Sequence, residues 1–221
     1  MPIQRHEIDF KTLPADVLDQ WRGLPPAVVS DCMNRTQVMA GAIKPVGDGM
    51  RLVGQARTVT CMVGDNSAVH AAVGMVRPGE VLVVDAGGYE DTALWGGIMT
   101  RAALQRGIAG LVVDGAVRDV AEIRELGFSC FARAVVPAGP HKGFGGVIDG
   151  PISCAGCPVK PGDLVLGDDD GVCVVPLERA AGILTASLDK IAQEEQTNAD
   201  TAAGRLPSDR LGLPEPEILG E

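Results

Sequence analysis

Two neighbouring charged residues, Arg118 and Asp119, stand shortly after the apolar run GLVV (residues 110–113) in the segment DGAVRDVAE. A guanidinium group can hold an anionic oxygen and can stabilise the charge that develops on a keto group. A carboxylate beside it can bind a divalent metal ion, which would in turn hold the carboxylate and keto oxygens of one substrate. The pair therefore predicts a site for a 2-oxo acid.

The same segment also has the pattern of a helix start. Asp119 can cap the helix, and Glu122 can reach back to it from the third helical position, as in a capping box. Ile123 and Leu126 follow as apolar residues. Capping explains both acids but not Arg118, because a cation at a helix N-terminus meets the positive end of the helix dipole. We therefore expect an anionic group near Arg118.

A second candidate site lies at the start of the segment LWGGIMTRAALQRG, residues 94–107. The first backbone N–H groups of a helix have no acceptor within the helix, so a small carboxylate can bind there. The donors would be the amides of Gly96, Gly97, Ile98 and Met99. A close contact between helix and sheet, which only glycine permits, explains the glycine pair equally well, and both interpretations stay open.

Strand and helix patterns alternate around these candidates. Helices are predicted at 94–107 and 118–127, and strands at residues 50–63, 79–88, 110–117, 130–137 and 163–176. This alternation is typical of an α/β fold with a mostly parallel sheet. A helical lead-in at about 12–45 and a C-terminal helix with a tail at about 177–221 complete one expected domain, 1–221.

The composition excludes several classes of protein. Hydrophobic residues make up 46% and charged residues 22%, which excludes a disordered chain. A net charge of -10 and only 3% aromatic residues make direct binding of nucleic acid implausible. No run reaches the roughly 20 apolar residues of a membrane span, and no signal peptide is apparent, so we expect a cytoplasmic protein without membrane partners.

Other motifs have simpler explanations than chemistry. Cys154 and Cys157 have the spacing of half a metal site, but no second pair exists, and reduced thiols are the better interpretation. The acidic run at 168–170 fits a hairpin turn better than a cation site. Arg133, His141 and Lys142 are candidates for a second substrate carboxylate, although solvated loop positions explain them as well.

Gly97, Arg118, Asp119 and Glu122 together form the spacing G-x20-R-D-x2-E, with VLVVDAGG and LWGG before it and DLVLGDDDGVCVVP after it. This arrangement resembles the family of 4-hydroxy-4-methyl-2-oxoglutarate aldolase and the regulator of ribonuclease activity A, over about residues 24–213. The resemblance implies an αββα-type sandwich related to swivelling β/β/α domains. It also implies homotrimers or homohexamers with active sites between subunits.

The same resemblance implies roles for individual residues. Asp119 would bind a divalent metal cation, Mg²⁺ or Mn²⁺, whose other ligands are mostly water. Arg118 would contact the keto oxygen of a small 2-oxo acid, whose carboxylate would bind the amides from Gly96 to Met99. Glu194 corresponds to an acid that a neighbouring subunit can contribute, although a solvated helix face also explains it.

Two departures from the family pattern bear on activity. Aldolases of the family have an aspartate where this chain has Gly97, and Glu122 is a candidate to compensate for it. The best-known regulator lacks the aspartate that follows the arginine, so Asp119 favours an enzyme. The expected function is a metal-dependent lyase that forms pyruvate through a metal-stabilised enolate.

Two reactions of such a lyase can be ranked. Retro-aldol cleavage of 4-hydroxy-4-methyl-2-oxoglutarate or 4-carboxy-4-hydroxy-2-oxoadipate needs a base for the hydroxyl proton as well as an electron sink. Decarboxylation of oxaloacetate needs only the sink, so we expect it to be the more robust of the two activities. The alternative is a non-catalytic regulator that binds a ribonuclease.

Overall fold

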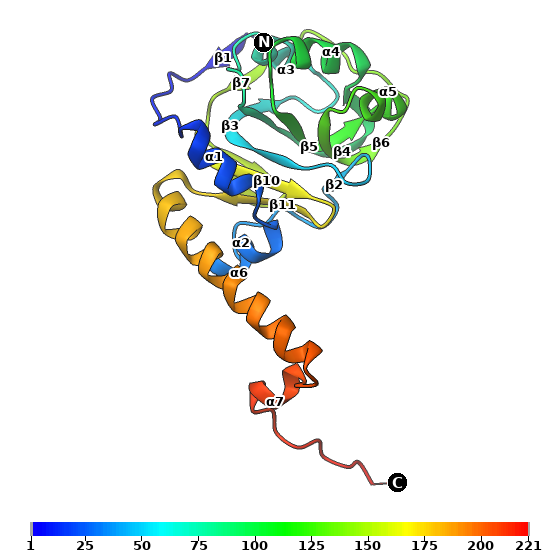
Figure 1. Ribbon diagram of the computed structural model, residues 1–221. Coiled ribbons are helices and arrows are strands. Elements are labelled where there is room, and N and C mark those ends of the chain that lie inside the picture. Colours follow the sequence, from blue (N-terminus) through cyan, green and yellow to red (C-terminus); the bar gives the residue numbers. More distant parts are fainter. Residues whose placement is uncertain (1, 221) are drawn as a thin grey trace.

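The computed structural model describes residues 2–220 and places its elements in four layers (Figure 1). Helices α3, α4 and α5 cover one face of a large sheet. The hairpin formed by β10 and β11 lies against the other face, and α2 and the first part of α6 cover this hairpin from outside. The layer order is therefore helix, sheet, sheet, helix, which confirms the expected αββα sandwich.

The helices are α1 (Ala15–Arg22), α2 (Pro26–Cys32), α3 (Ser67–Val73), α4 (Gly97–Gln105), α5 (Val120–Glu125), α6 (Ala180–Ala202) and α7 (Pro207–Leu211), with a 3₁₀ turn at Leu177–Arg179. The strands are β1 (Ile3–Arg5), β2 (Lys44–Pro45), β3 (Leu52–Cys61), β4 (Val81–Trp95), β5 (Gly110–Val117), β6 (Ser129–Val135), β7 (Gly146–Ile148), β8 (Ile152–Cys154), β9 (Cys157–Val159), β10 (Leu164–Asp168) and β11 (Gly171–Val175).

Three apolar cores lie between the four layers. Side chains alternate across a strand, so the continuous apolar run of β5 sends Leu111 and Val113 toward the helices and Val112 toward the second sheet. β10 divides in the same way, with Val165 facing the large sheet and Leu166 facing α2 and α6. Both faces of these strands are buried, which explains why their sequences are apolar throughout.

The large sheet has the strand order β1-β7-β3-β4-β5-β6-β2, and β3, β4, β5 and β6 run parallel. β3 belongs to both sheets, because residues 52–55 pair with β10 and residues 56–60 pair with β4. At the carboxyl edge, Trp95 at the end of β4 is the partner of Val117 at the end of β5. The chain after each of these strands therefore enters its helix at the same edge of the sheet.

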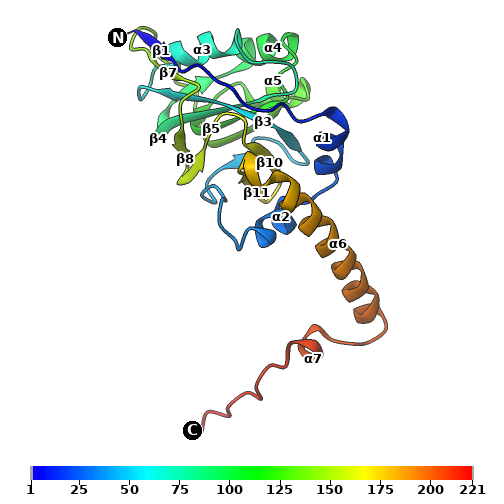
Figure 2. The ribbon, with the colours of Figure 1, turned by 90° about the vertical axis from the view of Figure 1, so that its left-hand side faces the viewer.

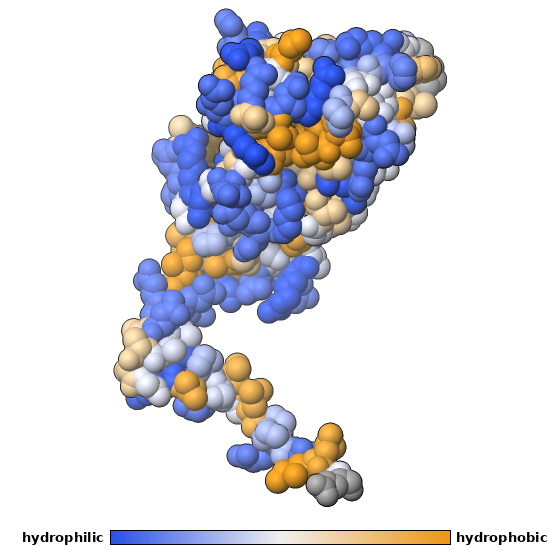
Figure 3. All heavy atoms as spheres, turned by 90° about the vertical axis from the view of Figure 1, so that its right-hand side faces the viewer, coloured by the Kyte–Doolittle hydropathy of each residue, from blue (hydrophilic) through white to orange (hydrophobic). Residues whose placement is uncertain are grey.

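The C-terminal part leaves the body of the molecule. The first half of α6 packs on α2, and its second half, α7 and the tail project away from the sandwich (Figures 1 and 2). Apolar side chains are exposed on this projecting arm (Figure 3), namely Leu206, Leu211, Leu213, Ile218 and Leu219. Within residues 2–220, no helix is both long and apolar enough to cross a bilayer.

Candidate active site

The first candidate residues meet where α4 and α5 begin side by side. The Arg118 amide donates a hydrogen bond to the Trp95 carbonyl at 2.9 Å, which continues the β4 and β5 pairing one residue beyond the strands. This contact places Arg118 and Asp119, which precede α5, next to Gly96 and Gly97, which begin α4. Two candidate motifs that are about twenty residues apart in the sequence therefore form one site.

Asp119 links the two helices. Its backbone is in the left-handed region, with φ 57°, at the residue before α5. This conformation turns the side chain across to α4, where Oδ2 accepts a hydrogen bond from the Gly97 amide at 3.0 Å. A Cβ at Gly96 would lie 2.5 Å from this oxygen, so position 96 must be glycine for Asp119 to come so close.

The predicted capping box is wrong. Asp119 occupies the N-cap position of α5, but its side chain makes no capping bond to that helix. The Glu122 side chain does not reach back either, and instead its Oε1 accepts a hydrogen bond from Arg101 Nε on α4 at 2.8 Å. Both acids of the segment therefore face the neighbouring helix, because the left-handed backbone at Asp119 directs the side chain away from its own helix.

Glu122 lies against the backbone of Gly97. A Cβ built on Gly97 would lie 2.7 Å from Glu122 Oε1 and closer still to Oε2. The carboxylate thus occupies the space in which a side chain at position 97 would begin. The acid next to position 97 therefore comes from α5 and not from α4.

The Arg118 guanidinium is half-exposed, and Nε lies 3.6 Å from Asp119 Oδ2. Asp119 is thus the anionic group that the sequence leads us to expect near Arg118. The chain crosses the guanidinium at Gly139, where a Cβ would lie 2.8 Å from Nη1. No hydrogen bond within residues 2–220 holds the guanidinium, so its donors are available to a ligand.

The start of α4 presents three backbone donors rather than the four expected. The Gly97 amide is used by Asp119. The amides of Gly96, Ile98 and Met99 donate to no acceptor in the described part of the chain. Since these groups have no partner inside the helix, they can hold a carboxylate beside Arg118.

These groups border a pocket of about 180 Å³. Its lining consists of Asn66, His70, Ala93, Leu94, Trp95, Gly96, Ile98, Met99, Arg118, Asp119, Pro140 and Lys142. Five of the predicted site residues, Gly96, Ile98, Met99, Arg118 and Asp119, thus share one cavity, with Gly97 and Glu122 directly beside it. Ile98 is 81% exposed at the mouth of the pocket.

Helix α3 and the residue before it contribute two pocket residues, His70 and Asn66, that the sequence analysis missed. The buried Asn66 donates from Nδ2 to the Leu94 carbonyl at 2.8 Å, while its Oδ1 has no partner among residues 2–220 and can accept a hydrogen bond from a ligand. His70 lies one turn later, and burial together with the charge of Lys142 lowers its pKa. The neutral form of His70 is therefore favoured. Polar residues four apart, in DNSAVHAAV, are the only sequence signal for this face.

Lys142 reaches the pocket on the loop between β6 and β7. This loop is fixed to the start of α3, because the buried Asp65 accepts hydrogen bonds from the amides of Ser67 at 2.8 Å and Phe144 at 3.2 Å. Burial alone would raise the pKa of Asp65, but these hydrogen bonds lower it, so the carboxylate stays ionised. On this loop Lys142 lines the pocket, whereas the adjacent His141 does not.

The remaining candidates lie elsewhere. Glu194 is on α6, where its Oε1 is 3.4 Å from Lys190 Nζ, and it does not reach the pocket of its own chain. Arg133 binds Asp114 with an Nε to Oδ1 distance of 2.5 Å.

The motifs with simpler explanations also lie away from the pocket. Cys154 and Cys157 face each other across the β8 and β9 hairpin as free thiols, and burial raises the pKa of Cys157 to about 12. Asp168 accepts a hydrogen bond from the Asp170 amide at 3.0 Å, which supports the interpretation of this acidic run as a hairpin turn.

Comparison with known proteins gives consistent matches. A family described as RraA-like, Aldolase/RraA, matches residues 15–174. A relative from Halalkalibacterium halodurans is 40% identical over 189 residues, which are 86% of this chain and 87% of the relative, and its name gives 4-hydroxy-4-methyl-2-oxoglutarate aldolase as a provisional activity. The 4-hydroxy-4-methyl-2-oxoglutarate aldolase of Thermus thermophilus is 36% identical over 148 residues, which are 67% of this chain and 90% of that protein.

A solved structure matches the fold over most of its length. Streptomyces coelicolor RraAS2, described as an unusual member of the RNase ES inhibitor RraA protein family, superposes with a TM-score of 0.76 at 28% identity. The match covers 85% of this chain and 98% of that protein. The chain is thus similar in sequence to relatives named as aldolases and in structure to a protein described as belonging to an inhibitor family.

Proposed function

The chain belongs to the RraA-like family, and from this premise we propose that it is a carbon–carbon lyase that releases pyruvate from small 2-oxo acids. One observation carries the proposal. A guanidinium that makes no hydrogen bond within residues 2–220, the carboxylate 3.6 Å from it, and three backbone amides without an acceptor in that part of the chain border the same pocket of about 180 Å³. These are the groups needed to bind a carboxylate, to hold a keto oxygen and to stabilise the charge that forms on it.

The substrate binds with its 1-carboxylate on the amides of Gly96, Ile98 and Met99. Arg118 then holds the 2-keto oxygen. Across the pocket Lys142 supplies a positive charge for the distal carboxylate, and this assignment is supported by its place in the lining. A diacid held at both ends has its reacting carbons between Arg118 and Asp119.

Asp119 suits a divalent ion that is bound mainly through water. Oδ2 is committed to the Gly97 amide, which leaves Oδ1 to bind Mg²⁺ or Mn²⁺. The described residues contain no cluster of three metal-binding side chains, so water would supply most other ligands, as Mg²⁺ tolerates. When bound, such an ion would act as a Lewis acid toward the keto and carboxylate oxygens of the substrate.

Decarboxylation of oxaloacetate needs few groups of the protein. The bond between C3 and C4 breaks, CO₂ leaves, and the electron pair passes to C3 and onto the keto oxygen, where Arg118 stabilises the negative charge. A proton from solvent then adds to C3 and gives pyruvate. No base is required, so this reaction depends on Arg118 and Asp119 but not on Glu122.

Retro-aldol cleavage of 4-hydroxy-4-methyl-2-oxoglutarate requires one group more. A base takes the proton of the C4 hydroxyl, the bond between C3 and C4 breaks, and the electron pair again passes to C3 and the keto oxygen. Protonation of C3 then gives two molecules of pyruvate in total. We assign the base to Glu122, directly or through one water, because its carboxylate occupies the space beside Gly97. The same scheme applies to 4-carboxy-4-hydroxy-2-oxoadipate.

A homotrimer or homohexamer is also part of the proposal. The projecting arm exposes apolar side chains that its own chain does not cover (Figure 3). Burial of apolar area favours packing of this arm on a second copy. Glu194 on α6 would then enter a neighbour's pocket, since it cannot enter its own.

Pyruvate release tests the proposal. The protein is assayed with oxaloacetate and with 4-hydroxy-4-methyl-2-oxoglutarate, with added Mg²⁺ and with a chelator. Turnover that depends on the metal and is lost in Asp119→Ala supports the lyase. If neither substrate is turned over and the protein instead retains a ribonuclease in a pull-down, the regulator suggested by the description of RraAS2 replaces it.

A further inference from the structure

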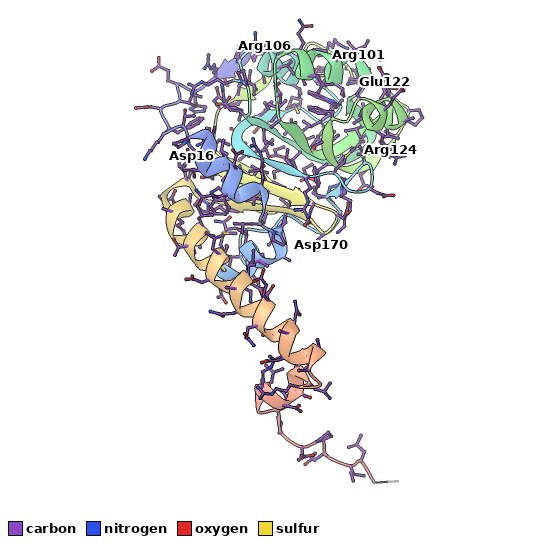
Figure 4. All side chains as sticks on the ribbon, viewed as in Figure 1. Asp16, Arg101, Arg106, Glu122, Arg124 and Asp170 are labelled. Carbon is purple, nitrogen blue, oxygen red and sulfur yellow. The ribbon has the colours of Figure 1, made fainter. Side chains whose placement is uncertain are left out.

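We propose that Arg101 is a positioning residue that holds Glu122 for retro-aldol cleavage, a role that rests on the proposed lyase function. Arg101 lies on α4, one turn after Gly97, and its Nε donates to Glu122 Oε1 at 2.8 Å. Figure 4 labels both side chains where α4 and α5 lie next to each other. The pair thus joins the helix that binds the substrate carboxylate to the helix that brings the base.

The two oxygens of Glu122 have different surroundings. Oε1 is held by Arg101, while Oε2 is the atom nearest to the position that a Cβ on Gly97 would take. One oxygen is therefore fixed by an ion pair and the other is left for proton transfer. The Glu122 side chain is 35% exposed, and holding it in one position costs rotamer entropy. Without the bond to Arg101 it can therefore rotate into solvent.

Arg101 acts through Glu122 and not on the substrate. It is absent from the residues that line the pocket, and its side chain is 63% exposed. Ion pairs with such exposure contribute little to the stability of the fold. A role in stability alone therefore predicts that removing Arg101 has almost no effect, whereas a positioning role predicts a loss confined to the reaction that needs a base.

The test compares Arg101→Met with Arg106→Met in the full-length protein. Arg106 is a matched control, because it is an exposed arginine directly after α4 and bonds to the Gly74 carbonyl, away from Glu122 (Figure 4). Arg101→Met should lower kcat for retro-aldol cleavage about tenfold, since small misplacements of catalytic groups are costly. KM for that substrate and the rate of oxaloacetate decarboxylation should stay within about twofold. Arg101→Lys should restore part of the loss, because an ammonium group can also donate to Oε1.

A double-mutant cycle separates positioning from a general effect. If Arg101 acts only through Glu122, Arg101→Met should cause no further loss in a Glu122→Gln background. An additive loss, an equal loss in both reactions or an unchanged retro-aldol rate would overturn the proposal. A wild-type protein that only decarboxylates oxaloacetate would overturn it while the lyase function stands. A wild type that turns over neither substrate would remove both.

Discussion

Gly97→Ala changes the candidate site by a single methyl group. The new Cβ would lie 2.7 Å from Glu122 Oε1 and closer to Oε2, whereas carbon and oxygen atoms in contact are about 3.5 Å apart. The carboxylate must therefore move by roughly 1 Å or more, and displacements of this size cost catalysis about 100-fold. Retro-aldol cleavage should fall by about that factor, while oxaloacetate decarboxylation should change little.

The stability of Gly97→Ala should remain close to that of the wild type. Alanine is favoured over glycine in helices by up to about 1 kcal/mol, and a displaced side chain costs about 0.5–1.5 kcal/mol, so the net change is within about 1 kcal/mol. For a chain of this length that corresponds to a shift in Tm of about 2–4 °C. Thermal unfolding therefore serves as the control for the two pyruvate assays.

A rescue variant makes this prediction sharper. Gly97→Asp combined with Glu122→Ala moves the acid from α5 to α4 and should recover much of the retro-aldol activity that Glu122→Ala alone loses. Gly97→Asp by itself places two carboxylates in one space and should be worse than the double variant. Retro-aldol activity of Gly97→Ala within threefold of the wild type, or equal losses with both substrates, would refute the role given to Glu122.

Three further outcomes are expected. Asp119→Ala and chelator treatment should each reduce turnover of both substrates by more than about 100-fold, and a chelator effect that added Mg²⁺ does not reverse would contradict the metal site. Burial lowers the pKa of His70 in the folded protein from its ordinary value of 6.5. As the pH drops below 6.5, the unfolded chain therefore binds a proton at His70 before the folded protein does, and the stability of the fold decreases. The pH slope of denaturation midpoints should thus be shallower in His70→Gln, and equal slopes would argue against a neutral His70. Arg57→Met should lower the free energy of unfolding by about 3–5 kcal/mol in urea titrations, because it removes the guanidinium that lies 2.7 Å from the buried Asp149 and 3.0 Å from the buried Glu80, and leaves Asp149 with only the half-exposed Arg5 at 3.1 Å.

Local patterns predict the layers of this fold but not every element. β5 lies at the predicted residues 110–117, because an apolar, β-branched run that ends in glycine and a charged pair has few structural alternatives to a strand. Helix α3 was missed because SAVHAAV is short, rich in small residues and without a strong apolar stripe. β4 continues to Trp95 beyond the predicted end, since irregular pairing with β5 extends the strand through its glycines.

The candidate site was likewise predictable from the sequence only in part. Its motif residues could be predicted to lie close together, because parallel strands bring the starts of α4 and α5 to one edge of the sheet. The partners of Asp119 and Glu122 could not, since they depend on a left-handed backbone at a residue other than glycine and on the packing of two helices. Such long-range contacts leave no local pattern in the sequence.

The short length of α5 has a consequence for how the site is maintained. A helix of six residues does not persist by itself, because its few internal hydrogen bonds do not offset the cost of ordering the backbone. The side chains of Glu122 and of Asp119, the residue before α5, each bond to α4, and with the buried Ile123 they anchor α5 to the rest of the molecule. Local unfolding of α5 therefore moves both acids away from the site. A bound substrate that favours the folded form of α5 would slow hydrogen exchange at the backbone amides of this helix.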